Sequence, residues 1–206
     1  MNRGRLITIE GIDGAGKTTL AAALLDALAG HGIDARLLRE PGGAPAAERI
    51  RALVIDPGLH VTARTEALLY AAARAQLVEE AIDPTLASGI WLVLDRYIDS
   101  SLAYQGGGRE LGVDAVRTIN EFAIRTVWPD RTLLLMIEPS LGRSRSRSRS
   151  DAPDRLEREE DEFFERTVAA YLELCSQDPN RIRKIDASLP PDEVLAAALR
   201  EIADLL

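Results

Sequence analysis

The sequence predicts an α/β fold, with a five-stranded parallel sheet and helices on both of its faces. Short apolar runs alternate with helical patterns along the chain, which is the signature of this class. The run Ile90–Asp95 is apolar up to its final carboxylate, as expected of a strand that is buried on both faces. The 206 residues show no internal repeat and no linker, so we expect one domain spanning residues 1–206.

The predicted elements follow one another in regular order. The expected strands are Leu6–Glu10, Ala35–Leu38, Ile90–Asp95, Thr132–Glu138 and Arg181–Ala187. A glycine loop and a helix ending at Gly30 follow the first strand. Further helical patterns cover about 45–55, 63–88 and 112–127, and the last helix begins after Pro190 and Pro191. In open α/β sheets ligands bind at the carboxyl ends of the strands, and the polar clusters of this sequence fall at or facing those ends.

Composition limits the classes of function. The formal net charge of −8 and the pI of about 4.9 disfavour broad electrostatic binding to nucleic acid or to an anionic membrane. Cys175, the one cysteine, excludes an internal disulfide and fits buried packing in an intracellular protein. No stretch approaches the ~20 apolar residues that span a bilayer, and the N-terminal apolar run is too short for a signal peptide. We therefore expect a cytoplasmic protein.

A phosphate-binding loop follows the first strand. The stretch GIDGAGKT, from Gly11 to Thr18, satisfies the pattern G-x-x-x-x-G-K-[ST] between a strand and a helix. Its glycines let backbone N–H groups converge on phosphate oxygens at a helix N-terminus. Lys17 is expected to reach the β- and γ-phosphates, and the Thr18 hydroxyl to ligate Mg²⁺. The sequence therefore predicts a P-loop NTPase fold, with a nucleoside triphosphate held by Gly11, Ile12, Asp13, Gly14, Ala15, Gly16, Lys17, Thr18 and Thr19.

A second charged element ends the third predicted strand. Asp95 is placed to hold Mg²⁺ through water, the usual acidic partner of a phosphate loop. Arg96 beside it faces the same cleft and is suited to bidentate phosphate binding. The alternative is a local ion pair at the strand end.

Five segments make the sequence resemble bacterial thymidylate kinases. They are EGIDGAGKTT, REPGG, LLYAAARAQLVEEAIDPTLASG, LDRYIDSSLAYQGGGRE and DRLEREEDEFFERTVAAYLEL, which occur in the family's order between Glu10 and Leu174. The resemblance implies direct in-line transfer of the γ-phosphoryl group of ATP to dTMP, with Mg²⁺, giving dTDP and ADP. It also implies a homodimer formed through helices beside the sheet. The helices at 63–88 and 112–127 either supply the dimer interface or pack only within the core of one chain.

The resemblance assigns residues to the thymine and the sugar. Tyr70 stands where the family usually has Phe, the ring on which thymine stacks, although plain helix core is the alternative. Arg74, four residues later on the same helix face, matches the arginine that hydrogen-bonds the base, a surface charge being the alternative. Ser101 and Gln105 match positions that read the base edge. Tyr104 matches the residue that packs near the sugar and disfavours a 2′-hydroxyl.

The resemblance also assigns residues to the acceptor phosphate. Arg96 is expected to hold the dTMP phosphate in line for attack, and Asp13 to lie near the acceptor sugar and phosphate. Arg51 resembles a second nucleotide-facing arginine or is a surface charge, and Glu40 of REPGG faces the acceptor pocket. The predicted catalytic residues outside the arginine-rich segment are Asp13, Lys17 and Arg96.

The arginine-rich stretch GRSRSRSRSD lies where bacterial members of the family have a mobile lid, at about 142–155. Phosphoryl transfer needs positive charge around the migrating group, and apart from Lys17 the phosphate loop carries no basic residue. We favour Arg147 and Arg149 as the catalytic arginines, with Arg155 as a further candidate. Glu157 matches the family carboxylate that approaches the metal, a solvated charge being the alternative.

Other functions remain open from the sequence alone. A kinase for another deoxynucleoside or deoxynucleotide would show a different preferred acceptor. A nucleotide-dependent switch or an inactive binding module would bind nucleotide without acceptor-dependent turnover. An RNA-binding or phosphorylated arginine-serine segment is disfavoured, because the chain is acidic and the run lies between core elements.

Overall fold

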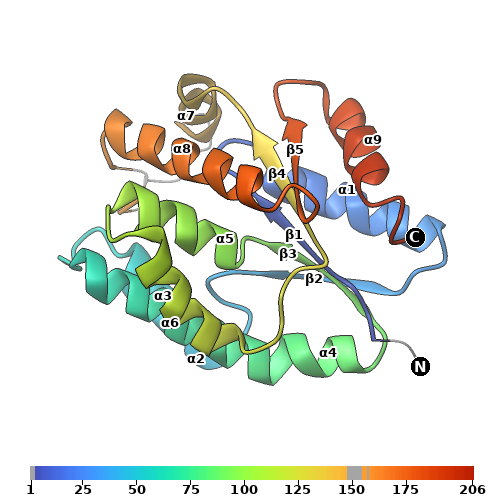
Figure 1. Ribbon diagram of the computed structural model, residues 1–206, viewed down its shortest axis with the longest axis horizontal. Coiled ribbons are helices and arrows are strands. Elements are labelled where there is room, and N and C mark those ends of the chain that lie inside the picture. Colours follow the sequence, from blue (N-terminus) through green and yellow to red (C-terminus); the bar gives the residue numbers. More distant parts are fainter. Residues whose placement is uncertain (1–2, 148–154, 157) are drawn as a thin grey trace.

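The computed structural model describes residues 3–147, 155–156 and 158–206, and Figure 1 shows the arrangement of their elements. Within this part of the chain the strands form one five-stranded sheet of order β2-β3-β1-β4-β5, in which neighbouring strands are parallel. The strands are β1 (Leu6–Glu10), β2 (Ala35–Arg39), β3 (Trp91–Asp95), β4 (Arg131–Met136) and β5 (Ile182–Asp186). The predicted fold class is confirmed. β1 lies at the centre, so the loop that follows it opens between two neighbouring strands.

Helices occur at all the predicted ranges, and the described residues include three more that had no predicted boundaries, at 98–101, 139–147 and 161–177. The helices are α1 (Lys17–Gly30), α2 (Pro45–Ile55), α3 (Ala63–Leu77), α4 (Asp83–Ala87), α5 (Ile98–Ser101), α6 (Val113–Ile124), α7 (Pro139–Arg147), α8 (Asp161–Gln177) and α9 (Pro191–Glu201). Two π-helical turns, η1 (Val78–Ile82) and η2 (Leu102–Gly108), continue α3 and α5. The helix predicted at 63–88 is thus one helical run with a π turn at its middle. Prolines at the first turns of α2 and α9 fit helix starts, where no intrahelical N–H bond is lost.

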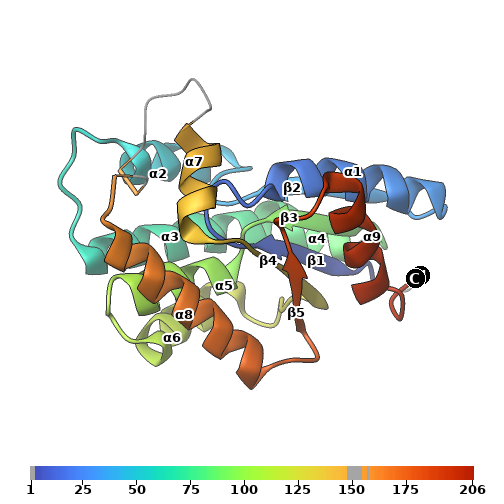
Figure 2. The ribbon, with the colours of Figure 1, turned by 90° about the horizontal axis from the view of Figure 1, so that it is seen from above.

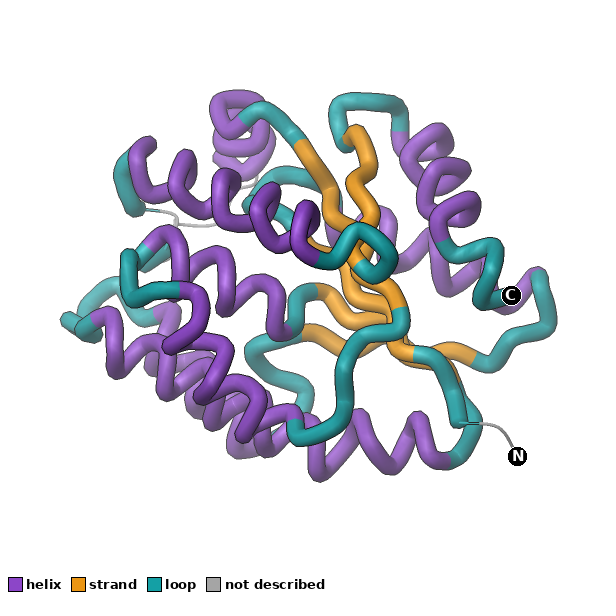
Figure 3. The backbone as a smooth tube through the Cα atoms, viewed as in Figure 1, coloured by secondary structure: helices purple, strands orange, loops and turns teal. Residues whose placement is uncertain are grey.

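Alternating side chains of the strands point to the two faces of the sheet. Ile7, Ile9 and Leu133 lie in a cluster with residues of α1 and α9, which cover one face. Leu6 and Leu134 lie in a second cluster with residues of α3, α6 and α8 on the other face. Figure 2 shows α1 and α9 on one side of the strands and α3, α6 and α8 on the other, and Figure 3 shows the strands between these helices. Burial on both faces explains why the strands read as continuous apolar runs.

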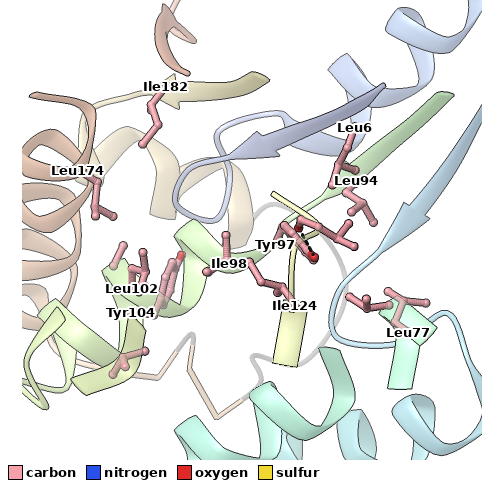
Figure 4. Close-up of a cluster of buried hydrophobic side chains, with 14 of the residues drawn as sticks. Leu6, Leu77, Leu94, Tyr97, Ile98, Leu102, Tyr104, Ile124, Leu174 and Ile182 are labelled. Carbon is pink, nitrogen blue, oxygen red and sulfur yellow. Dashed lines mark hydrogen bonds between the residues drawn. The ribbon is translucent and has the colours of Figure 1, made fainter. Parts of the chain in front are cut away.

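The larger apolar cluster runs beneath the loops that form the site. Figure 4 shows Tyr97 of this layer next to Leu94 of the sheet, with Ile98 beside it and Leu102 farther along, near Tyr104. The Tyr97 hydroxyl is fully buried and donates a hydrogen bond to the Val127 carbonyl at 2.9 Å. The segment after β3 is therefore fixed from below by packing.

A buried ion pair ties β5 to the segment after β3. Arg181 donates to both carboxylate oxygens of Asp99, at 2.6 and 3.0 Å, and to the hydroxyl of Thr132 at 2.9 Å. Thr132 in turn donates to Asp99 at 2.9 Å and shares a hydrogen bond with Thr8. Asp99 is fully buried, so its charge depends on this one guanidinium group and its hydroxyl neighbour.

None of the helices in the described ranges is both long and apolar enough to cross a membrane.

We predict that Asp99→Ala lowers the free energy of unfolding by about 3–5 kcal/mol, because it removes the fully buried carboxylate that Arg181 binds through both oxygens. Among the described residues, only the half-exposed Asp178 then remains as a carboxylate partner of Arg181. Arg3→Ala is the matched control, since Arg3 pairs with Asp83 at 2.9 Å where both side chains are about half exposed. The control is expected to cost less than about 1 kcal/mol. Urea unfolding of both variants measures the difference, and equal losses would contradict the structural role given to Asp99.

Candidate functional site

Two cavities lined by described residues meet at the carboxyl ends of β1, β2 and β3. The first, next to the phosphate loop, is lined by Lys17, Thr18 and Asp95 among others. The second extends toward α3 and η2 and is lined by Tyr70, Tyr104 and Gln105 among others. Residues that line both cavities are Asp13, Glu40, Arg51 and Arg96. The boundary between the cavities is therefore built from charged groups of the three loops that follow β1, β2 and β3 and of helix α2.

The phosphate loop has the backbone that its glycines permit. Gly14 and Gly16 have φ values of 80° and 92°, a region that favours glycine. The Lys17 ammonium donates to the carbonyls of Gly11 at 3.1 Å and Ile12 at 3.0 Å. Burial and the nearby charge of Arg96 lower the pKa of Lys17 to about 8. The cation is thus held inside the loop that is expected to receive phosphate.

Thr18 and Asp95 lie together at the entrance of helix α1. The Thr18 hydroxyl donates to the Asp95 carboxylate at 3.0 Å. A hydroxyl and a carboxylate supply the hard oxygen ligands that Mg²⁺ prefers when phosphates complete its shell. The pair predicted from the sequence is brought together by the structure, and its oxygen donors fit this ion.

Asp13 and Arg96 form the contact at the boundary of the two cavities. The Arg96 guanidinium donates to Asp13 at 2.6 Å, and the Lys17 ammonium lies 3.6 Å from the same carboxylate oxygen. Burial alone would raise the pKa of Asp13, but the charges of Arg96 and Lys17 outweigh it and hold that pKa well below its usual range. Asp13 is therefore ionised at neutral pH, and it keeps two cations facing each other.

The backbone of Arg96 lies in the left-handed region, with a φ of 71°. Its N–H donates to the Ile9 carbonyl, and the following N–H, of Tyr97, donates to the Glu10 carboxylate at 2.8 Å. This turn sends the Arg96 side chain into the cleft, away from the direction of the strand. The sequence reading did not identify Glu10 as a support of the site, although a charged residue at the end of a buried strand is a signal for one.

Glu10 also accepts hydrogen bonds from two hydroxyl groups. Ser100 donates to it at 2.5 Å and Tyr171 at 2.9 Å. Burial, followed by the nearby charge of Asp99, raises the pKa of Glu10 above its usual value. Ser100 also accepts a hydrogen bond from Arg96 at 3.1 Å, so Glu10 supports Arg96 through its backbone and through this hydroxyl.

Arg74 is buried at the base of the second cavity. Its guanidinium donates to Glu40 and to Ser101 at 2.8 and 2.9 Å, and to the Tyr97 carbonyl at 2.9 Å. It also hydrogen-bonds Asn120 of α6 and forms an ion pair with Glu40 at 2.6 Å. The structure thus accounts for an arginine on an apolar helix with protein partners. Arg74 lines the cavity and is not a surface charge.

Gln105 and Ser101 reach the same cavity from the segment after β3. Gln105 is almost fully buried, and its side-chain nitrogen donates to Glu66 at 2.7 Å. Glu66 is completely buried in α3 and also binds Arg109 and Arg155. The sequence reading missed Glu66, because a glutamate near the start of a helix reads as a solvated charge.

The two tyrosines of the cavity differ in their surroundings. Tyr104 is nearly buried, accepts a hydrogen bond from Arg96 at 3.2 Å, and has that guanidinium 5.0 Å above its ring. Tyr70 is half-buried and lines the cavity, so plain helix core does not describe it.

Arg51 lines both cavities and donates to the Pro41 carbonyl at 3.1 Å. The structure therefore brings all the predicted acceptor residues to one cavity.

The start of the arginine-rich segment packs against the phosphate loop. A Cβ atom at Gly14 would collide with the Gly142 carbonyl, so the two backbones touch because both residues are glycine. Arg143 of α7 pairs with Asp161 and lies over the Phe164 ring, and Arg145 donates to the Ala187 carbonyl at 2.9 Å.

The remaining predictions for this segment are tested less fully. The backbone of Arg147 belongs to α7, but its side chain, together with Arg149 and Glu157, lies outside the described residues. Arg155, the further catalytic candidate, instead donates to the Val54 carbonyl at 2.9 Å and to Glu66 at 2.5 Å. These bonds give Arg155 a structural position between α2 and α3.

Comparisons with known proteins agree on one family. The family model described as thymidylate kinase matches residues 9–198. The chain is 47 % identical over 208 aligned residues to the thymidylate kinase of Bordetella petrii, with 98 % of each chain covered. It is 45 % identical to that of Halorhodospira halophila, covering 99 % of this chain and 96 % of the relative. It is 46 % identical to that of Lacticaseibacillus casei, covering 97 % and 95 %.

We predict that affinity for a nucleoside triphosphate falls about tenfold between about pH 7 and about pH 9, because Lys17 loses its proton with a pKa of about 8 in the free protein. The phosphates favour the charged ammonium, so binding weakens on the alkaline side. Calorimetric titration over this range measures the slope. Lys17→Arg keeps its charge and is expected to flatten the profile. Equal slopes in both proteins would contradict the assignment.

Proposed function

The chain belongs to the thymidylate kinase family and phosphorylates dTMP with ATP, and from this premise we propose that the phosphoryl group moves across the boundary of its two cavities. The observation that carries the proposal is the set of residues lining both cavities, in which Arg96 and Asp13 lie in contact. A donor phosphate in the first cavity and an acceptor phosphate in the second would meet there. Direct in-line transfer then depends on positioning and on charge stabilisation.

On the donor side, residues Gly11–Thr19 bind the ATP phosphates, and Lys17 neutralises the charge that develops on them. Thr18 would ligate Mg²⁺ and Asp95 would hold it through water, with Glu157 as a further proposed ligand. The 3.0 Å contact of Thr18 and Asp95 supports the first two of these assignments. An ion held by these residues would supply Lewis-acid stabilisation of the charge on the phosphates.

On the acceptor side, Arg96 binds the dTMP phosphate and turns it toward the donor. Asp13 orients Arg96 and lies next to the sugar and phosphate, while Arg51 adds positive charge. Glu40 faces the same space: among the described residues its Oε1 atom is buried without a hydrogen-bond partner. Burial raises the pKa of Glu40 despite the opposing charge of Arg74. A hydrogen-bond donor of the nucleotide would give this buried oxygen the partner that it lacks within the described part of the chain.

The base occupies the inner end of the second cavity. Tyr70 provides the stacking ring, and Ser101 and Gln105 read the edge of thymine. Tyr104 packs near the sugar and excludes a 2′-hydroxyl, which is supported by its nearly complete burial against Arg96. Arg74 contacts the base by giving up one of its hydrogen bonds to protein groups. Its hydrogen bonds to Ser101 and Glu40 hold these two side chains in place.

The arginine-rich segment at about 142–155 supplies positive charge to the transferred group, through Arg147 and Arg149. Two observations support this role. The loop carries glycine at position 14, where Gly142 leaves no room for a side chain. The segment begins with Gly142, which touches the phosphate loop at Gly14.

A homodimer is proposed through α3 and α6, which pack side by side (Figure 1). Leu68 and Phe122 are 57 % and 88 % exposed, and neither is explained by the fold of one chain. On α6, Ala115, Ile119 and Phe122 share one face at helical spacing. We further propose a cytoplasmic location and no nucleic-acid partner, in keeping with the net charge of −8.

The first experiment measures ADP release from Mg-ATP with dTMP, dUMP, dCMP, dGMP, thymidine or no acceptor. We expect turnover with dTMP first and dUMP second. Arg96→Ala is expected to lower kcat/KM for dTMP at least about 100-fold while ATP affinity changes only a few-fold, because Arg96 is assigned to the acceptor phosphate.

Arg36→Ala is the matched control, since Arg36 is an exposed arginine of β2 that lines neither cavity. It is expected to leave both constants unchanged. Preferred turnover of thymidine, which lacks the phosphate, would refute the role given to Arg96.

Phe122→Arg is expected to convert the dimer to a monomer of 22.4 kDa, because a charge replaces the most exposed large apolar side chain of the described surface. Sedimentation velocity distinguishes this mass from twice its value. Leu189→Arg, in the loop between β5 and α9, places the same charge away from α3 and α6. The dimer proposal fails if wild type and both variants sediment alike.

A further inference from the structure

We propose that Glu66 fixes the orientation of the Gln105 amide and thereby makes the acceptor site select thymine over cytosine. The inference rests on the proposed role of Gln105 as a reader of the base. Glu66 itself lines neither cavity and is completely buried, so it acts through Gln105 as a positioning residue.

The orientation follows from the chemistry of the contact. Gln105 Nε2 lies 2.7 Å from Glu66 Oε1. A carboxylate accepts hydrogen bonds and cannot donate them, so only the nitrogen end of the amide can face it. None of the hydrogen bonds found between described residues uses Gln105 Oε1. Because Gln105 lines the acceptor cavity, the atom that it offers there is an acceptor.

Glu66 is held so firmly that it cannot turn away. Arg109 donates to both of its carboxylate oxygens, at 3.3 and 3.1 Å, and Arg155 donates to Oε2 at 2.5 Å. Arg155 is itself fixed by the Val54 carbonyl, and Arg109 by Glu159 at 2.7 Å. Two guanidinium groups therefore balance the buried charge and set the carboxylate plane.

The fixed acceptor distinguishes two pyrimidine edges. Thymine and uracil present a donor at N3–H, which matches Gln105 Oε1. Cytosine presents an acceptor at N3 and a donor at its 4-amino group, so N3 requires the Gln105 nitrogen instead. Rotating the amide would place its oxygen against the Glu66 carboxylate, two acceptors with no proton between them. Cytosine is disfavoured either way, whereas uracil is not, because it shares the N3–H of thymine.

The test is Glu66→Gln, assayed as kcat/KM for dTMP, dUMP and dCMP. A glutamine at this position can either donate or accept, so the Gln105 amide is free to rotate. We expect the dTMP/dCMP ratio to fall at least about tenfold and the dTMP/dUMP ratio to stay unchanged. Glu159→Gln removes the other carboxylate partner of Arg109 without touching Gln105, and it is expected to leave both ratios unchanged.

A folded Glu66→Gln protein with the wild-type dTMP/dCMP ratio would overturn the inference. Gln105→Ala separates this from failure of the proposed site. If Gln105→Ala also keeps the ratio, Gln105 does not read the base, and the proposed site is wrong. If Gln105→Ala abolishes discrimination while Glu66→Gln does not, only the role of Glu66 fails.

A measurement on the wild-type protein covers the case in which Glu66→Gln does not fold. The chain has three glutamines, Gln76, Gln105 and Gln177, so selective ¹⁵N labelling resolves their side-chain amides. The Gln105 amide proton that faces Glu66 is expected to exchange slowly with solvent before any nucleotide is added, because it already binds the Glu66 carboxylate. Rapid exchange in the free enzyme would contradict the fixed orientation.

Discussion

The pairing of β1 with β3 is the constraint on which the geometry of the site depends. Their register places Ile9 beside Asp95, so the phosphate loop and the charged turn after β3 leave the sheet side by side. Arg96 extends this pairing through its N–H, then turns in the left-handed region toward Asp13. Glu10, the last residue of β1, holds the next amide. Two neighbouring strand ends thus suffice to bring the Lys17 ammonium and the Arg96 guanidinium to the Asp13 carboxylate.

Buried charge is the second organising principle, and it is compensated locally. Glu10, Glu66 and Asp99 are carboxylates without solvent exposure, and each is surrounded by N–H or O–H donors supplied by elements far away in the sequence. Transfer of such groups from water is costly unless their hydrogen bonds are made. The site therefore cannot relax into many arrangements, since moving one partner leaves a buried charge unsatisfied. Rigid positioning of this kind is what a reaction governed by electrostatic stabilisation requires.

The sequence allowed the sheet, the phosphate loop and the Asp95–Arg96 turn to be predicted, because each is encoded by neighbouring residues. Periodicity, glycine spacing and a carboxylate at a strand end are local signals. The partners of Glu66 lie 39, 43 and 89 residues away, and nothing local marks them. Arg155 illustrates the difference: it was a catalytic candidate among many arginines, yet packing between α2 and α3 gives it a buried structural contact.

The contact of Gly14 with Gly142 explains how charge is distributed around the phosphate loop. A side chain at position 14 would point into α7 at Gly142, so an arginine at this position of the loop would displace the helix. Lys17 is enclosed by carbonyls and Arg96 is committed to Asp13 at the boundary with the acceptor cavity. This arrangement is why we propose that additional positive charge approaches the donor phosphates from outside the loop. The described start of the arginine-rich segment lies at this glycine contact, which supports the proposal that the arginines of the segment supply that charge.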